Sequence, residues 1–254
     1  MFDFLKPSHY TSSSSNNSSP LSFSLPTALI LLDNQAAFAH PTSLHPDDTP
    51  GSSRSNPLFE VNLTSLLAAF RVARETSLSS SSGQDHDTSI TSGNPHLEII
   101  HVFHTSDSPA SPLHPHHPGN GIRPLDFARP LPPESGEDGD PASAREGEKF
   151  LWKSVASEPI GPELESHLRN QGIQQILFAG LRTDDCVSAT VRMAAHRGIV
   201  EPGRIVLVAD STATWAKAGV DAETVHAGAV AALEGEFAQV MRTEDVVKAL
   251  RRMK

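Results

Sequence analysis

The one cysteine of this chain, Cys186, stands where a thiol can act as a nucleophile. It follows the segment GLRTDD (residues 180–185), which connects an apolar run to the first turn of an expected helix. A helix N-terminus offers free N–H groups and a partial positive charge, which stabilise a thiolate and can hold an oxyanion. The alternative interpretation is a small buried hydrophobic residue, because free cysteines are often buried. Asp184 and Asp185 would raise the thiol pKa unless they face away as helix N-cap residues.

Two further residues can complete a cysteine site. Asp33 directly follows the apolar run ALILL (residues 28–32), where a carboxylate can accept the proton of a thiol. Its alternative role is to cap the loop that follows. The ammonium of Lys153 would favour both the Asp33 carboxylate and a Cys186 thiolate. At ~4 Å this attraction of about 4 kcal/mol would lower the thiol pKa by ~2 to 3 units. A solvated surface lysine is the alternative.

Metal and cofactor signatures are weaker than these three residues. The chain has 13 histidines, and three of them lie in the segment PLHPHHPG (residues 112–119). Zinc ligation by this segment is one interpretation, but its prolines stiffen it and the chain has no HExxH motif, so we expect no metal. The GxSxG, GxxxxGK[ST] and GxGxxG motifs are also absent from the sequence. Serine-hydrolase, P-loop and dinucleotide chemistry therefore lack their signatures, and we expect no cofactor.

The elements that must position these residues alternate between short apolar runs and helical patterns. This alternation predicts a three-layer α/β/α sandwich around a mainly parallel sheet. Ligands bind at the carboxyl ends of such strands, which directs attention to Asp33, His104, residues 180–186 and Asp210. The expected strands are residues 28–32, 97–103, 176–179, 204–209 and 237–241, and the expected helices are 58–74, 162–170, 185–197, 221–233 and 244–252.

Polar segments interrupt this pattern. We expect residues 1–26 to form a disordered tail and residues 27–254 to form one domain, with polar insertions near 42–56, 76–93 and 132–148. These segments are rich in Ser, Pro, Gly and Asp. They cannot bury enough apolar surface to offset the entropy of ordering the chain, so we expect loops or disorder there.

Composition excludes several classes of protein. A chain of 254 residues is long enough for one α/β domain with a sizeable core. Its 30 acidic residues against 20 basic ones give a net charge of −10, which argues against nucleic-acid or anionic-membrane partners. One cysteine allows no intramolecular disulfide, and no apolar run approaches the length of a membrane span. Together with the lack of a secretory signal, these features favour a soluble, cytoplasmic protein.

Several segments together resemble a known family. These are ILLDNQ (residues 30–35) with Phe38, then Lys153, then GLRTDDCV (residues 180–187). They are similar to the isochorismatase-like cysteine hydrolases, a superfamily that includes nicotinamidase and N-carbamoylsarcosine amidohydrolase. The resemblance covers most of the chain from about Thr27 onward, outside the polar insertions. The segment HVFHTS (residues 101–106) also looks like one branch of these hydrolases.

The resemblance implies a catalytic triad of Asp33, Lys153 and Cys186. In such a family Cys186 is the nucleophile, Asp33 takes its proton and later helps to activate water, and Lys153 stabilises the ionised pair. The N–H groups of Arg182 and Cys186 would form the oxyanion hole, with a cis peptide expected at Leu181–Arg182. Relatives of this kind are commonly dimers or tetramers, so a homo-oligomer is expected.

Three aromatic residues lie beside the presumed catalytic segments. We predict that Phe38, His104 and Trp152 bind the substrate, which is expected to be a small molecule. The alternative for each of these side chains is simple packing in the core.

The most concrete functional prediction is a cysteine-dependent hydrolase of a small amide or ureide. The C–N bond would break through a thioester intermediate. The alternative is a catalytically silent binding or scaffold protein on the same fold, suggested by Asp184, Asp185 and the polar insertions. A third possibility is a one-cysteine redox sensor with an exposed thiol of low pKa. A thiol pKa near the free value of ~8.5 would favour the scaffold, and a value well below it would favour the enzyme.

Overall fold

A single parallel sheet forms the centre of the computed structural model, which describes residues 21–39, 52–81, 96–133, 147–154 and 160–253. In these residues six strands lie in the order β3-β2-β1-β4-β5-β6, and every neighbouring pair is parallel. The strands are β1 (Thr27–Leu32), β2 (Leu97–His104), β3 (Lys149–Lys153), β4 (Gln175–Leu181), β5 (Ile205–Ala213) and β6 (Gln239–Met241).

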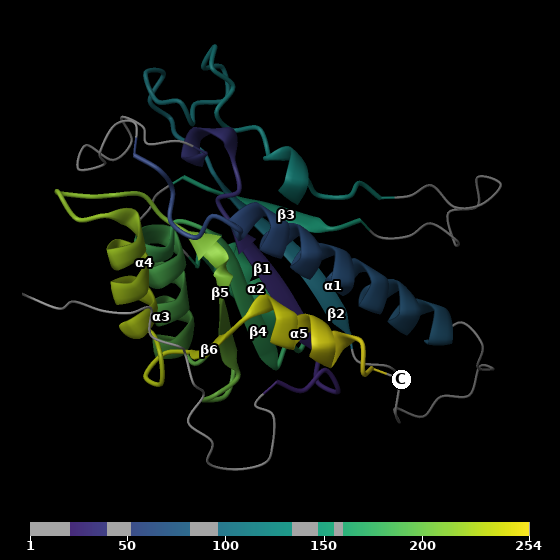
Figure 1. Cartoon of the computed structure of the whole chain (residues 1–254). Coiled ribbons are helices and arrows are strands. Elements are labelled where there is room, and N and C mark those ends of the chain that lie inside the picture. The colour runs from purple at the N-terminus through teal and green to yellow at the C-terminus, as the bar shows by residue number, and fades with distance from the viewer. Residues whose placement is uncertain (1–20, 40–51, 82–95, 134–146, 155–159, 254) are drawn as a thin grey trace, which may run out of the picture.

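Helices cover both faces of this sheet, so the predicted three-layer sandwich is confirmed (Figure 1). One face carries α1 (Phe59–Ser81) and α5 (Thr243–Leu250), and the other carries α2 (Pro162–Asn170), α3 (Ser188–His196) and α4 (Ala222–Ala231). Each face buries its own hydrophobic cluster, and β1 contributes alternate residues to both. A strand that is buried on both faces is apolar along its whole length, and for this reason residues 28–32 could be predicted as a strand.

The path of the chain through the sheet creates a switch point between β1 and β4. From β1 the chain adds β2 and β3 on one side, and from β4 it adds β5 and β6 on the other. The chain therefore leaves the carboxyl ends of β1 and β4 toward opposite sides of the sheet. In open parallel sheets ligands bind at this kind of position.

Gly180 allows β1 and β4 to meet closely at the switch point. A Cβ atom added there would lie 2.2 Å from the carbonyl oxygen of Leu32, and the residue has a φ of 117°. Both the space and the backbone conformation therefore require glycine. The next residues of the chain lead directly to Cys186.

Strand β3 is the element that the sequence analysis missed. The sequence KFLWK has no apolar face in the usual sense, because Phe150 and Trp152 are exposed while Leu151 and Lys153 are buried. β3 pairs with β2 alone in the described residues and lies at the edge of the sheet, where one backbone edge of the strand has no partner strand.

The folded part of the chain extends further into the polar segments than predicted. Residues 1–20 lie outside the described residues, but Leu21 and Phe23 of the expected tail are buried, and the ring of Phe23 packs edge-on against Phe70. Helix α1 continues to Ser81, so the expected loop near 76–93 begins later. Ser77, on the same side of the helix as Phe70 and Ala73, is buried there. Helical spacing of small and apolar residues thus outweighs the serine-rich composition.

The other two insertions also have ordered ends. Ser55, in the segment near 42–56, is fully buried and forms two hydrogen bonds with Thr214. Glu148, the last residue of the segment near 132–148, is buried and bonds to Arg71 and His101. The central parts of both segments, residues 40–51 and 134–146, lie outside the described residues.

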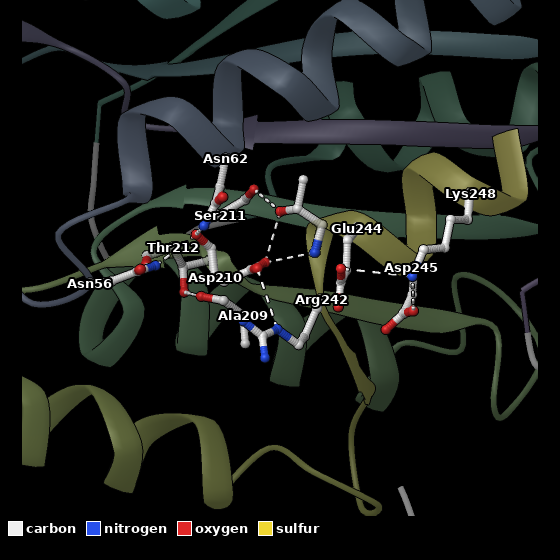
Figure 2. A network of polar contacts seen from close by, with 11 residues as sticks. Asn56, Asn62, Ala209, Asp210, Ser211, Thr212, Arg242, Glu244, Asp245 and Lys248 are labelled. Atoms are coloured by element: carbon white, nitrogen blue, oxygen red, sulfur yellow. Dashed lines mark hydrogen bonds and ion pairs between the residues drawn. The ribbon is translucent and has the colours of Figure 1, made fainter. Parts of the chain in front are cut away.

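Asp210 belongs to the packing of the sheet and not to the edge where the other candidates lie. β5 continues past the predicted end to Ala213, with a register irregularity opposite Phe178 and Gly180. The carboxylate of Asp210, labelled in Figure 2, accepts hydrogen bonds from the backbone N–H and the hydroxyl of Thr243, both at 2.7 Å. Because Thr243 is the first residue of α5, Asp210 caps this helix from a neighbouring strand.

No helix in the described part of the chain combines the length and the apolar character needed to cross a lipid bilayer.

Candidate active site

Four neighbouring strands each bring one reactive side chain to the same edge of the sheet. Lys153 ends β3, His104 ends β2, Asp33 follows β1, and Cys186 follows β4. Because the strand order is β3-β2-β1-β4, residues that lie far apart in the sequence become neighbours in space. Asp33, Lys153 and Cys186, expected to act together, are brought together here.

Asp33 and Lys153 form a buried ion pair. Lys153 Nζ lies 2.9 Å from Asp33 Oδ2, and the two side chains are only 6% and 0% exposed. Asp33 has a φ of 50°, an uncommon conformation for a residue other than glycine, directly after the last residue of β1. Its N–H donates to the carbonyl of Val102, which fixes the turn against β2.

The ammonium form of Lys153 is the stable one in this setting. Burial alone would lower its pKa. The charges of Asp33 and Cys186, and hydrogen bonds to both, outweigh that effect and raise the pKa of Lys153 above its ordinary value. The alternative of a solvated surface lysine is therefore wrong, because Lys153 is buried and paired with Asp33.

The surroundings of Cys186 favour a protonated thiol. Burial raises its pKa well above the ordinary value, the negative charges of Asp33 and Asp185 raise it further, and Lys153 only partly opposes them. Lys153 does act in the expected direction and lowers the thiol pKa, but the net shift is upward. The reason is that the thiol is 3% exposed and lies beside a carboxylate, neither of which is visible in the sequence.

The raised thiol pKa of Cys186 bears on the redox-sensor and scaffold alternatives in different ways. A redox sensor needs an exposed thiol of low pKa, and Cys186 is buried with a raised pKa. A raised pKa no longer favours a scaffold, however, because a carboxylate lies within reach to take the proton when it is needed. One ligand atom each of Asp33, His104 and Cys186 lies within 4.8 Å of the others.

The segment that carries Cys186 is a π-helical turn, Thr183–Val187, that leads into α3. Before it, the peptide bond between Leu181 and Arg182 is cis, as predicted. The side chain of Arg182 is buried, so the backbone and the side chain of this residue both belong to the interior. The carbonyl of Cys186 accepts a hydrogen bond from Thr190, which ties the turn to α3.

The carboxylate of Asp184 contacts the segment after β5. Asp184 accepts a hydrogen bond from Thr214 and forms an ion pair with Lys217 at 3.3 Å. Burial would raise the pKa of Asp184, but the bond from Thr214 and the charges of Arg182 and Lys217 lower it, so the carboxylate stays ionised. Asp184 therefore anchors the π-helical turn to the segment after β5. The charge of Asp185 raises the thiol pKa, as its position suggested.

His104 is held from two sides. Its backbone N–H donates to Gln35 Oε1 at 2.7 Å, and Gln35 Nε2 donates back to its carbonyl at 2.9 Å. The ring of Phe38 stacks on the imidazole, with 6.2 Å between centroids and 24° between planes. Phe38 is almost fully buried, so it reaches the cluster as the support of His104.

Trp152 faces away from the cluster. Neighbouring residues of a strand point to opposite faces, and Lys153 points toward Asp33. The indole instead packs against Phe103 at 5.4 Å and is 46% exposed, on the face of the sheet covered by α1. Of the three aromatic residues predicted to bind substrate, the structure brings His104 and Phe38 to the cluster and places Trp152 elsewhere.

Asp33, His104 and Cys186 are also the one set of three potential metal ligands found among the described residues. Their donor types suit zinc. The ammonium of Lys153 already supplies a positive charge 2.9 Å from Asp33, which disfavours a second cation at that carboxylate. The histidine-rich segment 112–119 uses two of its ring nitrogens on nearby backbone N–H groups, at His116 and Gly119.

A comparison with known families identifies the family of this chain. The family model described as the Isochorismatase domain matches residues 27–245, which span all the strands and the four residues of the cluster. The chain belongs to the isochorismatase family. It is thus a hydrolase of that family, and the resemblance inferred from the sequence is confirmed.

Individual relatives agree with this assignment. The uncharacterized isochorismatase family protein YrdC of Bacillus subtilis is 28% identical over 225 residues, which cover 87% of this chain and 94% of that protein. A putative isochorismatase-family hydrolase from Chromobacterium violaceum is also 28% identical, with a TM-score of 0.64 over 92% of this chain and 98% of its own. A cysteine hydrolase from Pseudomonas syringae shares the fold at 17% identity, with a TM-score of 0.66 over 96% and 100% of the two chains.

In this isochorismatase-family hydrolase, Gln35 is a further residue of the site, and it was not among the predicted site residues. It is fully buried, and besides gripping His104 it donates to the carbonyl of Ile122 at 3.1 Å. One amide side chain thus ties the ends of β1 and β2 to the loop that follows β2. Its position two residues after Asp33 was the available signal, because a polar residue there lies at the same edge of the sheet.

Proposed function

We propose that this protein is a cysteine-dependent hydrolase that cleaves the C–N bond of a small amide or ureide through a thioester. The observation that carries the proposal is the buried set of a thiol, a carboxylate and an ammonium at one edge of the sheet. The Asp33–Lys153 distance is 2.9 Å, and Asp33 and Cys186 are within 4.8 Å. A nucleophile, a base and a fixed positive charge are the parts that acyl transfer to a thiol requires.

The first step is attack by sulfur. Asp33 takes the thiol proton as Sγ approaches the carbonyl carbon of the substrate, and Lys153 stabilises the negative charge that the proton leaves behind. Because the thiol is protonated in the free protein, proton transfer and attack belong to the same event. The raised thiol pKa of the resting site is compatible with this mechanism.

The second step is stabilisation of the tetrahedral oxyanion. In this proposal the N–H groups of Arg182 and Cys186 donate to it, as the family resemblance implies. Both belong to the segment between β4 and α3, where the cis peptide and the π-helical turn shape the backbone. Loss of one such donor typically costs about 10²-fold to 10³-fold in rate.

The third step is loss of ammonia or an amine, which carries away the proton that Asp33 took from the thiol. Water then attacks the thioester. Asp33, restored as a carboxylate, takes a proton from that water and returns it to sulfur as the C–S bond breaks, which regenerates the thiol. The presence of Cys186 favours an amide or ureide carbonyl over chemistry that needs no nucleophile.

The test is ammonia or amine release from a panel of small amides and ureides, with the wild type and the Cys186→Ala and Cys186→Ser variants. We expect turnover in the wild type alone, and a covalent acyl adduct on Cys186 when the reaction is quenched with acid and analysed by mass spectrometry. Exposed His196→Gln, on the helix that follows Cys186, is the matched control and should behave as the wild type. Full activity in Cys186→Ala would exclude the mechanism, and a wild type inert on every compound would favour a silent binding protein.

A further inference from the structure

The catalytic cluster contains a fourth titratable side chain that the Asp–Lys–Cys scheme leaves without a task. A ring nitrogen of His104 lies within 4.8 Å of both a carboxylate oxygen of Asp33 and Sγ of Cys186. We propose, building on the function proposed above, that His104 is a catalytic residue that delivers the thiol's proton from Asp33 to the departing nitrogen of the substrate.

The distance suits that task. After attack, the departing nitrogen is two bonds from Sγ, and a proton donor must come within about 3 Å of it. A ring nitrogen that lies no more than 4.8 Å from Sγ can meet this condition without any movement of the backbone. His104 also lies beside Lys153 in the sheet, since the two residues are register partners in β2 and β3.

The other two members of the cluster are poorly suited to the same task. Lys153 holds its proton tightly, because the charges around it raise its pKa above the ordinary value. Asp33 Oδ2 lies 2.9 Å from Lys153 Nζ, so this carboxylate is already engaged with the ammonium. An imidazole holds a proton more firmly than a carboxyl and less firmly than an ammonium, so it is the natural intermediate carrier.

The imidazole is also positioned as a catalytic group needs to be. Gln35 fixes the backbone on both sides of the residue, through the N–H and the carbonyl of His104. Phe38 stacks on the ring and restrains its plane. A base or acid that is oriented by a third group is the usual arrangement around an enzymatic nucleophile.

The protons balance across the step. The Sγ–C bond forms as the thiol proton passes to Asp33, and the carbonyl becomes an oxyanion. Asp33 then passes this proton to a ring nitrogen of His104, which becomes an imidazolium. When the intermediate collapses, the C–N bond breaks, its electron pair stays on nitrogen, and nitrogen takes a proton from the imidazolium. The thiol's proton has thus been transferred to the amine, and Asp33 and His104 both return to their starting states.

The experiment compares a leaving group that needs a proton with one that does not. Wild type and His104→Gln are assayed on an amide from the active panel and on the p-nitrophenyl ester of the same acyl group. We expect kcat/KM for the amide to fall about 100-fold or more in His104→Gln, while the ester rate stays within about threefold. The ester rate also reports whether the variant folds and whether Cys186 still reacts.

Two further variants complete the test. His104→Ala with added imidazole should recover part of the amide rate, because a free imidazole can carry the proton. His116→Gln, an exposed histidine of the segment 112–119, is the matched control and should match the wild type on both substrates.

The possible failures are distinct. Equal losses on amide and ester, or no loss on either, would overturn the role of His104 and leave the cysteine mechanism standing. If Cys186→Ala keeps the wild-type ester and amide rates, the proposed function fails and the role of His104 fails with it.

Discussion

Asp33 has two opposing effects on Cys186, and they can be separated. Its charge raises the thiol pKa, while its carboxylate is the base that the proposed reaction requires. Asp33→Asn should therefore lower the thiol pKa, since a negative charge beside the sulfur has gone. We expect iodoacetamide to alkylate Cys186 several-fold faster at pH 8 in this variant, and amide hydrolysis to fall about 100-fold or more.

The measurement is the pH dependence of alkylation, followed by mass spectrometry. In the wild type the rate should keep rising above the ordinary range of cysteine titration, because the thiol pKa is raised. In Asp33→Asn the same rise should occur at lower pH. An unchanged profile would show that the Asp33 charge does not act on the thiol.

Lys153 stabilises the fold as well as the site. Lys153→Met leaves the fully buried Asp33 carboxylate without its ion-pair partner, and breaking a buried pair in this way costs about 3 to 5 kcal/mol. We expect urea unfolding at pH 7 to show a loss of this size. Lys149→Met, at the other end of β3, is the matched control and should cost less than about 1 kcal/mol. Equal losses in both variants would contradict a specific role for the pair.

At the residue scale the sequence located the cluster better than it described its chemistry. Asp33 could be placed because it directly follows a strong apolar run, and Cys186 because it lies a few residues after another such run, at the start of an expected helix. The protonation state of Cys186 could not, because it depends on how completely the thiol is buried and on how close Asp33 lies. The burial of the thiol and its distance from Asp33 both depend on the order of the strands in the sheet, which could not be predicted from one sequence.

At the scale of the elements, a buried acid just before β3 links this strand to α1 and β2. Glu148 bonds to Arg71 of α1 at 2.6 Å and to His101 of β2 at 2.8 Å. Burial alone would raise the pKa of Glu148, but these hydrogen bonds and that from Leu131 lower it to about 2, from an ordinary value of 4.5.

This shift predicts an acid-dependent loss of stability. A group whose pKa is lower in the folded state stabilises the fold above its unfolded pKa, and the stabilisation disappears as the pH falls through the folded value. Glu148 should thus contribute about 3 kcal/mol at pH 7. That contribution should be lost between pH 4.5 and about pH 2.

Urea unfolding of Glu148→Gln against the wild type checks this expectation. The variant should be less stable at pH 7 and should lose less further stability on acidification. Exposed Glu163→Gln on α2 is the control and should follow the wild type. Parallel pH curves for Glu148→Gln and the wild type would contradict the assignment.

The close contact between β1 and β4 at Gly180 predicts that a larger side chain there destabilises the fold. Gly180→Ala puts a Cβ atom 2.2 Å from the carbonyl of Leu32 and forces an alanine to a φ of 117°. We expect a loss of about 3 kcal/mol or more in urea unfolding, from the clash and the strained backbone together. Gly172→Ala is the matched control, because it also has positive φ but no atom within 4 Å of the added carbon, and should cost about 1 kcal/mol.

The elements differed in how well the sequence revealed them. β1 and β4 are buried on both faces and give uninterrupted apolar runs. β3 was missed because its buried positions hold Leu151 and Lys153 while its aromatic residues face solvent, which reverses the usual pattern. The end of α1 was placed too early because Ser77 is buried for its small size, and composition alone suggested a loop.

For the whole molecule, the sheet order predicts a gradient of local stability from the centre to the edges. All six residues of β1 are buried, whereas the three residues of β6 are only partly buried. Hydrogen–deuterium exchange should therefore be slowest in β1 and β4, close to the rate set by global unfolding, and faster in β6 and β3. Rapid exchange in β1 relative to β6 would contradict this order.

The sheet order also dictates when the reactive groups come together as the protein is made. Translation delivers Asp33, His104 and Lys153 first, on the three strands β1, β2 and β3, and Cys186 only afterwards. A nascent chain still attached to the ribosome before β4 is complete therefore carries the base and the ammonium but no thiol. The nucleophile joins them only once β4 has paired with β1, so chemical competence depends on the one pairing that links the two halves of the sheet.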